Sequence, residues 1–258
     1  VSFHFKGPKI YGLIGRNGAG KTTLIRMITG LSSSTNGTIE LFGESNEFNL
    51  NKGRNRFGCI VEAPALYSNL TAQQNLEYYK ILRGIVEKDI ISKTLEIVGL
   101  HSTGKKKVKN FSLGMKQRLG LAIAILGNPD LIILDEPTNG LDPIGIIEMR
   151  NIIKRLNEDF NITILISSHI LPELSQIATK YGIIENGKLI KEITKSDLEI
   201  ECKRSLSIEV NDVEKATMVI EEVLNTNDYK VIDNNFIRLY KYLDKPEKVT
   251  SELIKNGI

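Results

Sequence analysis

The chain has 258 residues, enough for one large domain or two small ones with a buried core. Hydrophobic residues make up 41% and charged residues 25%, as in a typical globular protein, and the formal net charge of +3 is too small to predict nucleic-acid binding. The longest nearly unbroken apolar run covers residues 119–126, whereas a membrane-spanning helix needs about 20 apolar residues. We therefore expect neither a transmembrane segment nor a nucleic-acid partner.

The first part of the chain alternates short apolar runs with turns. A glycine-rich loop at residues 15–20 separates a run of strand length, residues 10–14, from an expected helix at residues 21–31. This order of strand, loop and helix is typical of the opening of α/β nucleotide-binding domains. Further short strands are expected at residues 1–5, 38–42 and 57–61.

The middle of the chain is predicted to be helical. Residues 71–83 and 88–98 show helical periodicity. Ser112 opens a third helix, which continues through the apolar run at residues 119–126 and ends before Pro129. Because this helix is apolar nearly all round at its far end, we expect it to be buried.

Two continuous aliphatic runs follow, at residues 131–134 and 162–167, with a helix expected between them at residues 144–156. Such runs are typical of central strands in a parallel sheet that is covered on both faces. An Asn-Gly turn within residues 183–190 predicts a β-hairpin.

The pattern changes after about Thr194, and a small α+β domain is expected at residues 195–258. Its expected elements are a strand at 206–210, a helix at 213–224 capped near Asn211 or Asp212, paired strands at 229–232 and 236–240, and a helix at 247–255 with Asp244 as its N-cap and Pro246 in its first turn.

The strongest motif is GRNGAGKTT at residues 15–23, which fits G-x-x-x-x-G-K-[ST] between a predicted strand and a predicted helix. Its glycines let backbone N–H groups converge on phosphate oxygens, and the helix points its positive end at the same anion. A glycine-rich turn without a ligand is the alternative, which the flanking strand and helix disfavour. Lys21 is expected to neutralise the outer phosphates and Thr22 to bind Mg²⁺. The expected phosphate-binding residues are Gly15, Asn17, Gly18, Ala19, Gly20, Lys21, Thr22 and Thr23.

Asp135 and Glu136 follow the buried run at residues 131–134, at a strand end where open α/β sheets bind ligands. Asp135 is suited to contact Mg²⁺, and Glu136 is placed to orient or deprotonate an attacking water. Alone, this pair could equally cap a helix. Beside the phosphate loop, it indicates a catalytic site.

Five segments occur in one order: GRNGAGKTT at 15–23, FSLGM at 111–115, DEP at 135–137, NGLD at 139–142 and SH at 168–169. Together they resemble the ATP-binding subunit of ABC transporters over about residues 1–194. The resemblance implies an α/β P-loop NTPase (RecA-like) core with a parallel sheet and a helical subdomain at about residues 66–126. Residues 1–194 would form the ATP-binding domain, followed by the small α+β domain.

The resemblance assigns roles by position. Lys21 belongs to the Walker A motif, Asp135 is the Walker B aspartate and Glu136 is the catalytic glutamate. His169 matches the switch histidine that contacts the γ-phosphate, although by itself it could be a hydrogen-bonded histidine at a strand end. We therefore expect Glu136, His169 and Lys21 to be catalytic, with ATP and Mg²⁺ bound.

Ser112 and Gly114 match the signature motif, although alone they would indicate an ordinary helix N-cap. Leu113 and Met115 depart from the usual LSGGQ pattern, but the two anion-facing positions remain. Asp142 matches the end of the D-loop, which communicates between subunits. In the family, the signature helix reaches the ATP of a second subunit, so a head-to-tail homodimer is expected.

Glu62 occupies the place where most of the family has a glutamine that contacts Mg²⁺. A carboxylate there keeps an oxygen ligand but adds negative charge near the metal and the γ-phosphate. The expected metal-binding residues are thus Thr22, Asp135 and Glu62. The alternative is that Glu62 is a neutral exchange.

The segment EAPALY at residues 62–67 is similar to the bacitracin-resistance and lantibiotic-immunity type of exporter ATPase. The function implied is ATP hydrolysis that drives a separate membrane permease, with the chain peripheral on the cytoplasmic face of the membrane. The expected cargo is a peptide antibiotic or another amphipathic compound. A soluble ABC-type ATPase acting on a ribosome or DNA, or a non-hydrolysing ATP-dependent binding module, remains the alternative.

Val1 already lies in a strand-like pattern, so we expect the start of the domain to be missing. In the family, an aromatic residue upstream of the first strand stacks on adenine. We assign no such residue here and expect weak ATP affinity.

Overall fold

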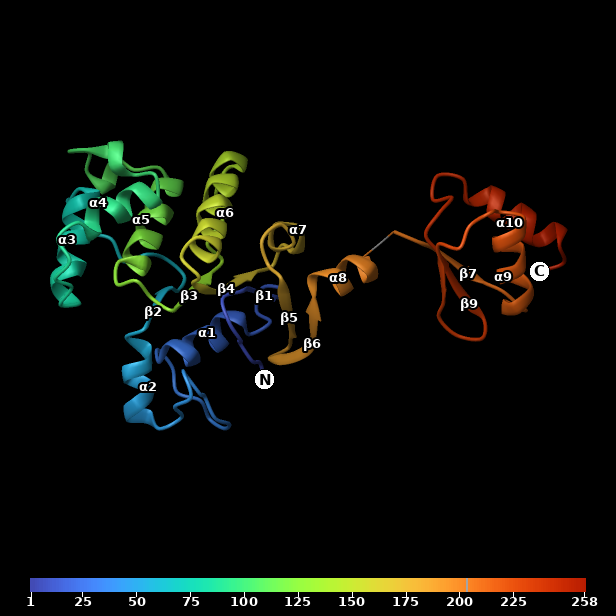
Figure 1. The fold of residues 1–258 in the computed structure, drawn as a ribbon, viewed down its shortest axis with the longest axis horizontal. Helices are drawn as coiled ribbons and strands as arrows, with labels where there is room; N and C mark the ends of the chain where they lie inside the picture. Colours follow the sequence, from blue (N-terminus) through green and yellow to red (C-terminus); the bar gives the residue numbers. More distant parts are fainter. Residues whose placement is uncertain (203) are drawn as a thin grey trace. The chain divides into compact units, whose positions relative to one another are not determined.

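Six strands form the central sheet of Val1–Lys195, the first of two compact units in the computed structural model (Figure 1). The structure describes residues 1–202 and 204–258. The strand order is β2-β3-β4-β1-β5-β6, in which the first five strands run parallel and β6 pairs antiparallel with β5. The strands are β1 (Ile10–Ile14), β2 (Phe57–Ile60), β3 (Leu131–Asp135), β4 (Thr163–Ser168), β5 (Lys180–Glu185) and β6 (Lys188–Thr194).

Helices cover both faces of this sheet. On one face, Ile25 of α1 (Lys21–Thr29) packs against a buried cluster that includes Leu13 and Ile133. On the other face, a small cavity is lined by side chains of α6 (Pro143–Glu158), β4 and α7 (Leu171–Leu174). The doubly wound α/β core expected from the sequence is confirmed.

Three further helices pack against one another beside this core, and they form the green group in Figure 1: α3 (Ala72–Leu82), α4 (Ile90–Ile97) and α5 (Leu113–Ile125). Leu76 and Leu119 are fully buried, and residues 119–125 of α5 are buried throughout, as its apolar sequence predicts. The other elements of this unit are α2 (Glu47–Arg54) and two 3-10 helices at His101–Thr103 and Val108–Asn110; α8 (Lys195–Cys202) follows β6.

The second unit, Ser196–Ile258, has its own core and an antiparallel sheet of order β7-β9-β8. Ile220 and Leu253 from its two helices pack with Ile237 and Leu239 from the sheet. The elements are β7 (Leu206–Glu209), α9 (Val213–Glu222), β8 (Tyr229–Val231), β9 (Phe236–Leu239) and α10 (Pro246–Lys255).

Two expected strands are wrong: residues 1–5 and 38–42, both within the described ranges, form none. The aromatic rings of Phe3 and Phe5 pack edge-on against Tyr11, so this apolar alternation reflects ring packing rather than a backbone ladder. At the second segment, a turn with positive φ at Phe42 and Gly43 leaves only an isolated bridge between Leu41 and Glu44.

One expected helix cap is also wrong. Lys245, not Asp244, precedes α10, because Pro246 already occupies the first helical position. Asp212 caps α9 by accepting a hydrogen bond from the backbone N–H of Lys215, as expected. In the described part of the chain, no helix has both the length and the apolar character needed to cross a bilayer.

Candidate active site

The glycine-rich loop between β1 and α1 is shaped by positions that only glycine fits well. Gly18 and Gly20 have φ values of +80° and +104°, in the left-handed region that side chains disfavour. A Cβ on Gly15 would collide with the backbone oxygen of Ile184. The β5–β6 turn supports the loop from outside, since the backbone N–H of Gly187 donates to the oxygen of Ala19 at 2.8 Å.

Lys21 begins α1, and its side chain turns back over this loop. The ammonium group donates to the carbonyl oxygens of Gly15 at 2.8 Å and Arg16 at 3.3 Å, and Lys21 is only 5% exposed. A buried ammonium needs several acceptors to offset its lost hydration. The loop therefore holds a positive charge at the N-terminus of α1, where an anion is favoured.

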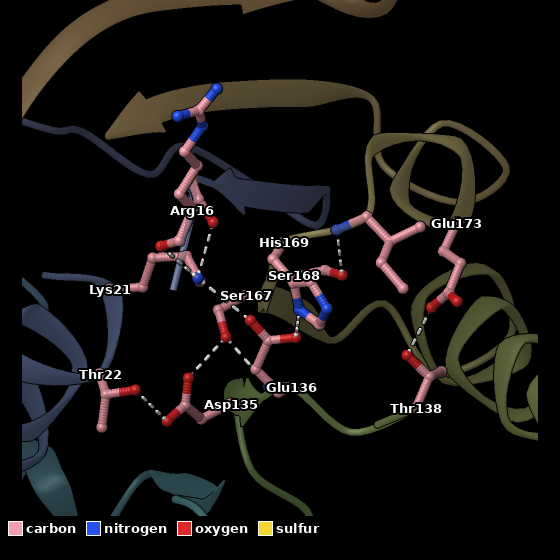
Figure 2. Close-up of polar contacts among 12 residues, drawn as sticks. Arg16, Lys21, Thr22, Asp135, Glu136, Thr138, Ser167, Ser168, His169 and Glu173 are labelled. Carbon is pink, nitrogen blue, oxygen red and sulfur yellow. Dashed lines mark hydrogen bonds and ion pairs between the residues drawn. The ribbon is translucent and has the colours of Figure 1, made fainter. Parts of the chain in front are cut away.

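Asp135, the last residue of β3, is buried and has both carboxylate oxygens engaged (Figure 2). The hydroxyl of Thr22 donates to Oδ2 at 2.7 Å, and the hydroxyl of Ser167 donates to Oδ1 at 2.6 Å. Both oxygens of this buried side chain therefore have a hydrogen-bond donor, as buried polar groups require. A direct hydrogen bond thus joins Thr22, next to the phosphate-loop lysine, to Asp135 at the end of β3.

Glu136 lies one residue beyond the sheet with a φ of +48°, a conformation that costs a non-glycine residue about 1–3 kcal/mol. Its backbone N–H donates to the Ser167 hydroxyl at 3.0 Å, which helps to hold this conformation. Its side chain then joins two groups: Oε1 lies 3.1 Å from Lys21 Nζ, and Oε2 lies 2.8 Å from His169 Nδ1 (Figure 2). One carboxylate therefore connects the phosphate loop to the segment that follows β4.

The oxygen atoms of Thr22 and Asp135 suit a Mg²⁺ ion. Mg²⁺ prefers hard oxygen ligands and is usually bound by one or two carboxylates together with substrate phosphates. The hydroxyl and carboxylate of this pair are already within hydrogen-bond distance, beside the loop that would carry the phosphates. Among the described residues, no group of three His, Cys, Asp or Glu side chains could hold a metal ion by itself.

Glu62, the third expected metal-binding residue, is engaged elsewhere in this structure. Its Oε1 lies 2.9 Å from the guanidinium of Arg26, one helical turn beyond Thr22 in α1. Glu62 also has a φ of +64° at the centre of a γ-turn, in which the Ala63 N–H donates to the oxygen of Val61 at 2.9 Å. Such turns are rare and strained, and strain of this kind gathers at functional sites.

The remaining expected residues form a second group at two helix N-termini. Ser112 caps α5 by accepting from Met115 N at 3.2 Å, and Asp142 caps α6 by accepting from Gly145 N at 3.0 Å. The two termini are neighbours, because a Cβ on Gly114 would lie 3.8 Å from the side chain of Leu141. Ser112 and Asp142 are exposed, as are Asn17 and Thr23 of the phosphate loop.

Sequence reasoning missed Ser167, which joins Asp135 to Glu136. A signal was present, because Ser167 ends the aliphatic run of β4 and pairs in register with Asp135 of the neighbouring strand. It also missed Thr138 and Glu173, which are hydrogen-bonded at 2.7 Å beyond the two strand ends.

Known proteins are similar to this chain in sequence and in fold. The family model described as ABC transporter matches residues 1–139. The bacitracin transport ATP-binding protein BcrA of Bacillus licheniformis is 48% identical over all 258 residues, which cover 84% of that protein. A lantibiotic transport ATP-binding protein of Streptococcus pyogenes is 47% identical over 192 residues, 74% of this chain and 82% of that protein. A solved ATP-binding subunit of an ABC transporter has 30% identity and a TM-score of 0.68, over 78% of this chain and 85% of the other.

Proposed function

We propose that this chain, which belongs to the ABC transporter family as an ATP-binding subunit, hydrolyses MgATP to drive a separate membrane permease. The observation that carries the proposal is the Glu136 carboxylate, which contacts both Lys21 and His169. A base, a phosphate-binding cation and a switch histidine within one contact network are what ATP hydrolysis requires.

ATP binding is proposed to release the base. The γ-phosphate competes with the Glu136 carboxylate for the Lys21 ammonium, which lies 3.1 Å from Oε1. Once Lys21 binds phosphate, Oε1 is free to accept a proton, while Oε2 keeps its contact with His169. A water then attacks the γ-phosphorus and its proton passes to Glu136. The bond from the γ-phosphorus to the bridging oxygen breaks, giving ADP and phosphate.

Thr22 and Asp135 are the residues proposed to hold Mg²⁺, with Glu62 as a further oxygen ligand once it leaves Arg26. Bound Mg²⁺ supplies charge neutralisation on the phosphate oxygens. Ser167 keeps Asp135 oriented through its hydrogen bond to Oδ1.

Two copies of the chain are proposed to complete two sites. Ser112, which is exposed, and Gly114 lie at the N-terminus of α5, a favourable place for the phosphates bound by a second copy. Asp142 opens the neighbouring helix, and the exposed apolar side chains of Ile144 and Ile147 extend this surface. Exposed apolar groups beside a polar binding surface favour association.

The permease is proposed to bind the outer side of α3. Tyr78 and Ile81 of this helix are exposed, as are Tyr67 before it and Val86 after it. Large exposed apolar side chains gathered on one helix are typical of a protein–protein contact. Association there would make the chain a peripheral protein on the cytoplasmic face of the membrane. The bacitracin and lantibiotic relatives favour export of a peptide antibiotic.

The test is phosphate release by the purified chain and by Glu136→Gln. We expect the variant to bind ATP but to lose about 10²–10⁴-fold in kcat, the usual contribution of a general base. Glu158→Gln, an exposed glutamate at the end of α6, is the matched control and should turn over normally. Equal turnover by Glu136→Gln and the wild type would contradict the assigned base.

The permease proposal has its own test, which is co-purification from membranes with the product of a neighbouring gene. We expect the partner to be a protein with several membrane-spanning segments. Cells that carry this partner and the wild-type chain should survive higher bacitracin concentrations than cells that carry the partner and Glu136→Gln. A ribosome or DNA fragment as the co-purifying partner would instead indicate a soluble ABC-type ATPase.

A further inference from the structure

Two side-chain contacts hold the segment after β3 against the segment after β4. The strands themselves pair up to Asp135 and Ser167, and the hydrogen-bonded ladder ends there. Beyond that point, the Glu136–His169 contact and a hydrogen bond between Thr138 and Glu173 join the two segments. The first contact belongs to the groups proposed to react, whereas the second does not touch them.

The second contact is well formed. The Thr138 hydroxyl donates to Oε2 of Glu173 at 2.7 Å. Thr138 follows Glu136 by two residues, and Glu173 follows His169 by four residues within α7. Figure 2 shows this pair to one side of the Lys21–Glu136–His169 group.

Its surroundings favour a firm hydrogen bond. Both partners are partly buried and line a small cavity together with the buried Ile153, Ile166 and Leu174 and with Arg150. A hydrogen bond to a carboxylate in such surroundings is stronger than one in water, and breaking it leaves a partly buried charge without its donor.

We propose that Thr138 and Glu173 are positioning residues for ATP hydrolysis, because their hydrogen bond fixes α7, and with it His169, against the segment that carries Glu136. This inference rests on the proposed function. Neither residue contacts Lys21 or Thr22 in the described structure, so the pair acts on the geometry of Glu136 and His169 and leaves the contacts of the phosphate loop unaltered. A misplacement of about 1 Å at reacting groups can cost about a hundredfold in rate.

The experiment measures kcat and KM for ATP, together with equilibrium ATP binding, for the full chain. Thr138→Val has nearly the same shape but no hydroxyl, and we expect its kcat to fall by about ten- to a hundredfold. KM and the dissociation constant should stay within about twofold of the wild type. Thr138→Ser restores the donor and should recover most of the lost kcat. If Thr138 acted only by filling space, the smaller serine would not restore the rate.

Two further variants complete the test. Glu173→Ala removes the acceptor and should match Thr138→Val, and the double variant should be no slower than either, because both changes break one contact. Thr163→Val is the matched control: it removes a threonine hydroxyl that donates to the oxygen of Gly7 at the far end of β4, and its kcat should equal that of the wild type.

The outcomes separate this inference from the proposed function. If the wild type hydrolyses ATP and Thr138→Val does so at the same rate, the positioning role is wrong but the proposed function stands. A raised KM with unchanged kcat, or a serine variant as slow as the valine variant, would overturn the positioning role too. A wild-type chain without turnover would overturn the proposed function first.

Discussion

At the scale of single residues, Glu62 has one observed partner, Arg26, and one proposed partner, the Mg²⁺ ion. In this structure its carboxylate pairs with Arg26, and both side chains are about half exposed, so the ion pair itself contributes little stability. The strained backbone at Glu62 shows that the surrounding chain holds the residue in a costly conformation. A carboxylate held weakly in a strained turn can be transferred to a metal ion at low cost.

This competition predicts opposite effects for two substitutions. Glu62→Gln removes a charged oxygen ligand, so Mn²⁺, used as a probe for Mg²⁺, should bind the ATP complex about tenfold more weakly by electron paramagnetic resonance. Arg26→Gln removes the competing cation and should tighten Mn²⁺ binding. If both variants bound Mn²⁺ as the wild type does, and ATP turnover kept its Mg²⁺ dependence, Glu62 would be a neutral exchange.

The sequence predicted Lys21, Thr22, Asp135 and Glu136 because their signals are local: a motif between a strand and a helix, and carboxylates at a strand end. The structure brings these four residues together. Thr138 and Glu173 could not be found in this way. Their contact spans 35 positions and depends on how α7 leaves the sheet, which no local pattern encodes.

At the scale of elements, α3 is held at its start by a reciprocal capping box. The Thr71 hydroxyl accepts from Gln74 N at 3.2 Å, while Oε1 of Gln74 accepts from Thr71 N at 3.0 Å. These bonds satisfy two of the backbone N–H groups at the helix start, where no preceding turn offers carbonyl partners. Because α3 carries the surface proposed for the permease, its first turn matters for both stability and assembly.

We expect Thr71→Ala to lower the free energy of unfolding by about 1 kcal/mol, the usual cost of losing such a cap. Urea denaturation followed by circular dichroism measures the change. Thr71→Ser keeps the oxygen and should remain close to the wild type. An alanine variant as stable as the wild type would show that Gln74 alone caps the helix.

Helices and strands whose apolar residues recur at a regular spacing were predictable from the sequence, and those without such a pattern were not. The buried run of α5 and the aliphatic strands β3 and β4 agree closely with expectation. Helix α2 was missed because its sequence, EFNLNKGR, has little apolar period and depends on the Asn46 cap, which accepts from Phe48 N at 2.9 Å. Because this helix buries only Leu50 and Gly53, its sequence shows no clear apolar face.

At the scale of the whole molecule, the N-termini of α5 and α6 are proposed to be half of a site that a second copy completes. Their caps, Ser112 and Asp142, are exposed, and so is Leu113 between the first cap and Gly114. Nucleotide held in one copy would thus add phosphate contacts to the other. Association should then depend on ATP and end with hydrolysis.

We therefore expect Glu136→Gln to dimerise in MgATP and to remain monomeric in MgADP, as measured by light scattering after size-exclusion chromatography. Adding Ser112→Glu places a negative charge against the partner's phosphates and should keep the protein monomeric. Ser92→Glu, the same substitution in the first turn of α4, is the control and should leave the dimer intact. Dimers that form equally without nucleotide would contradict this surface.

Under the proposed mechanism, the ion pair between Lys21 and Glu136 would also help the site to discriminate ATP from ADP. ADP lacks the γ-phosphate and so should compete less strongly for Lys21, which would leave the Glu136 carboxylate paired with the ammonium more often than in the ATP complex. The same exchange imposes a cost on ATP binding, since part of the phosphate–lysine attraction is spent in displacing Glu136. If Glu136 is the base, as proposed, the site would bind ATP somewhat less tightly but would have a free base only while ATP is bound.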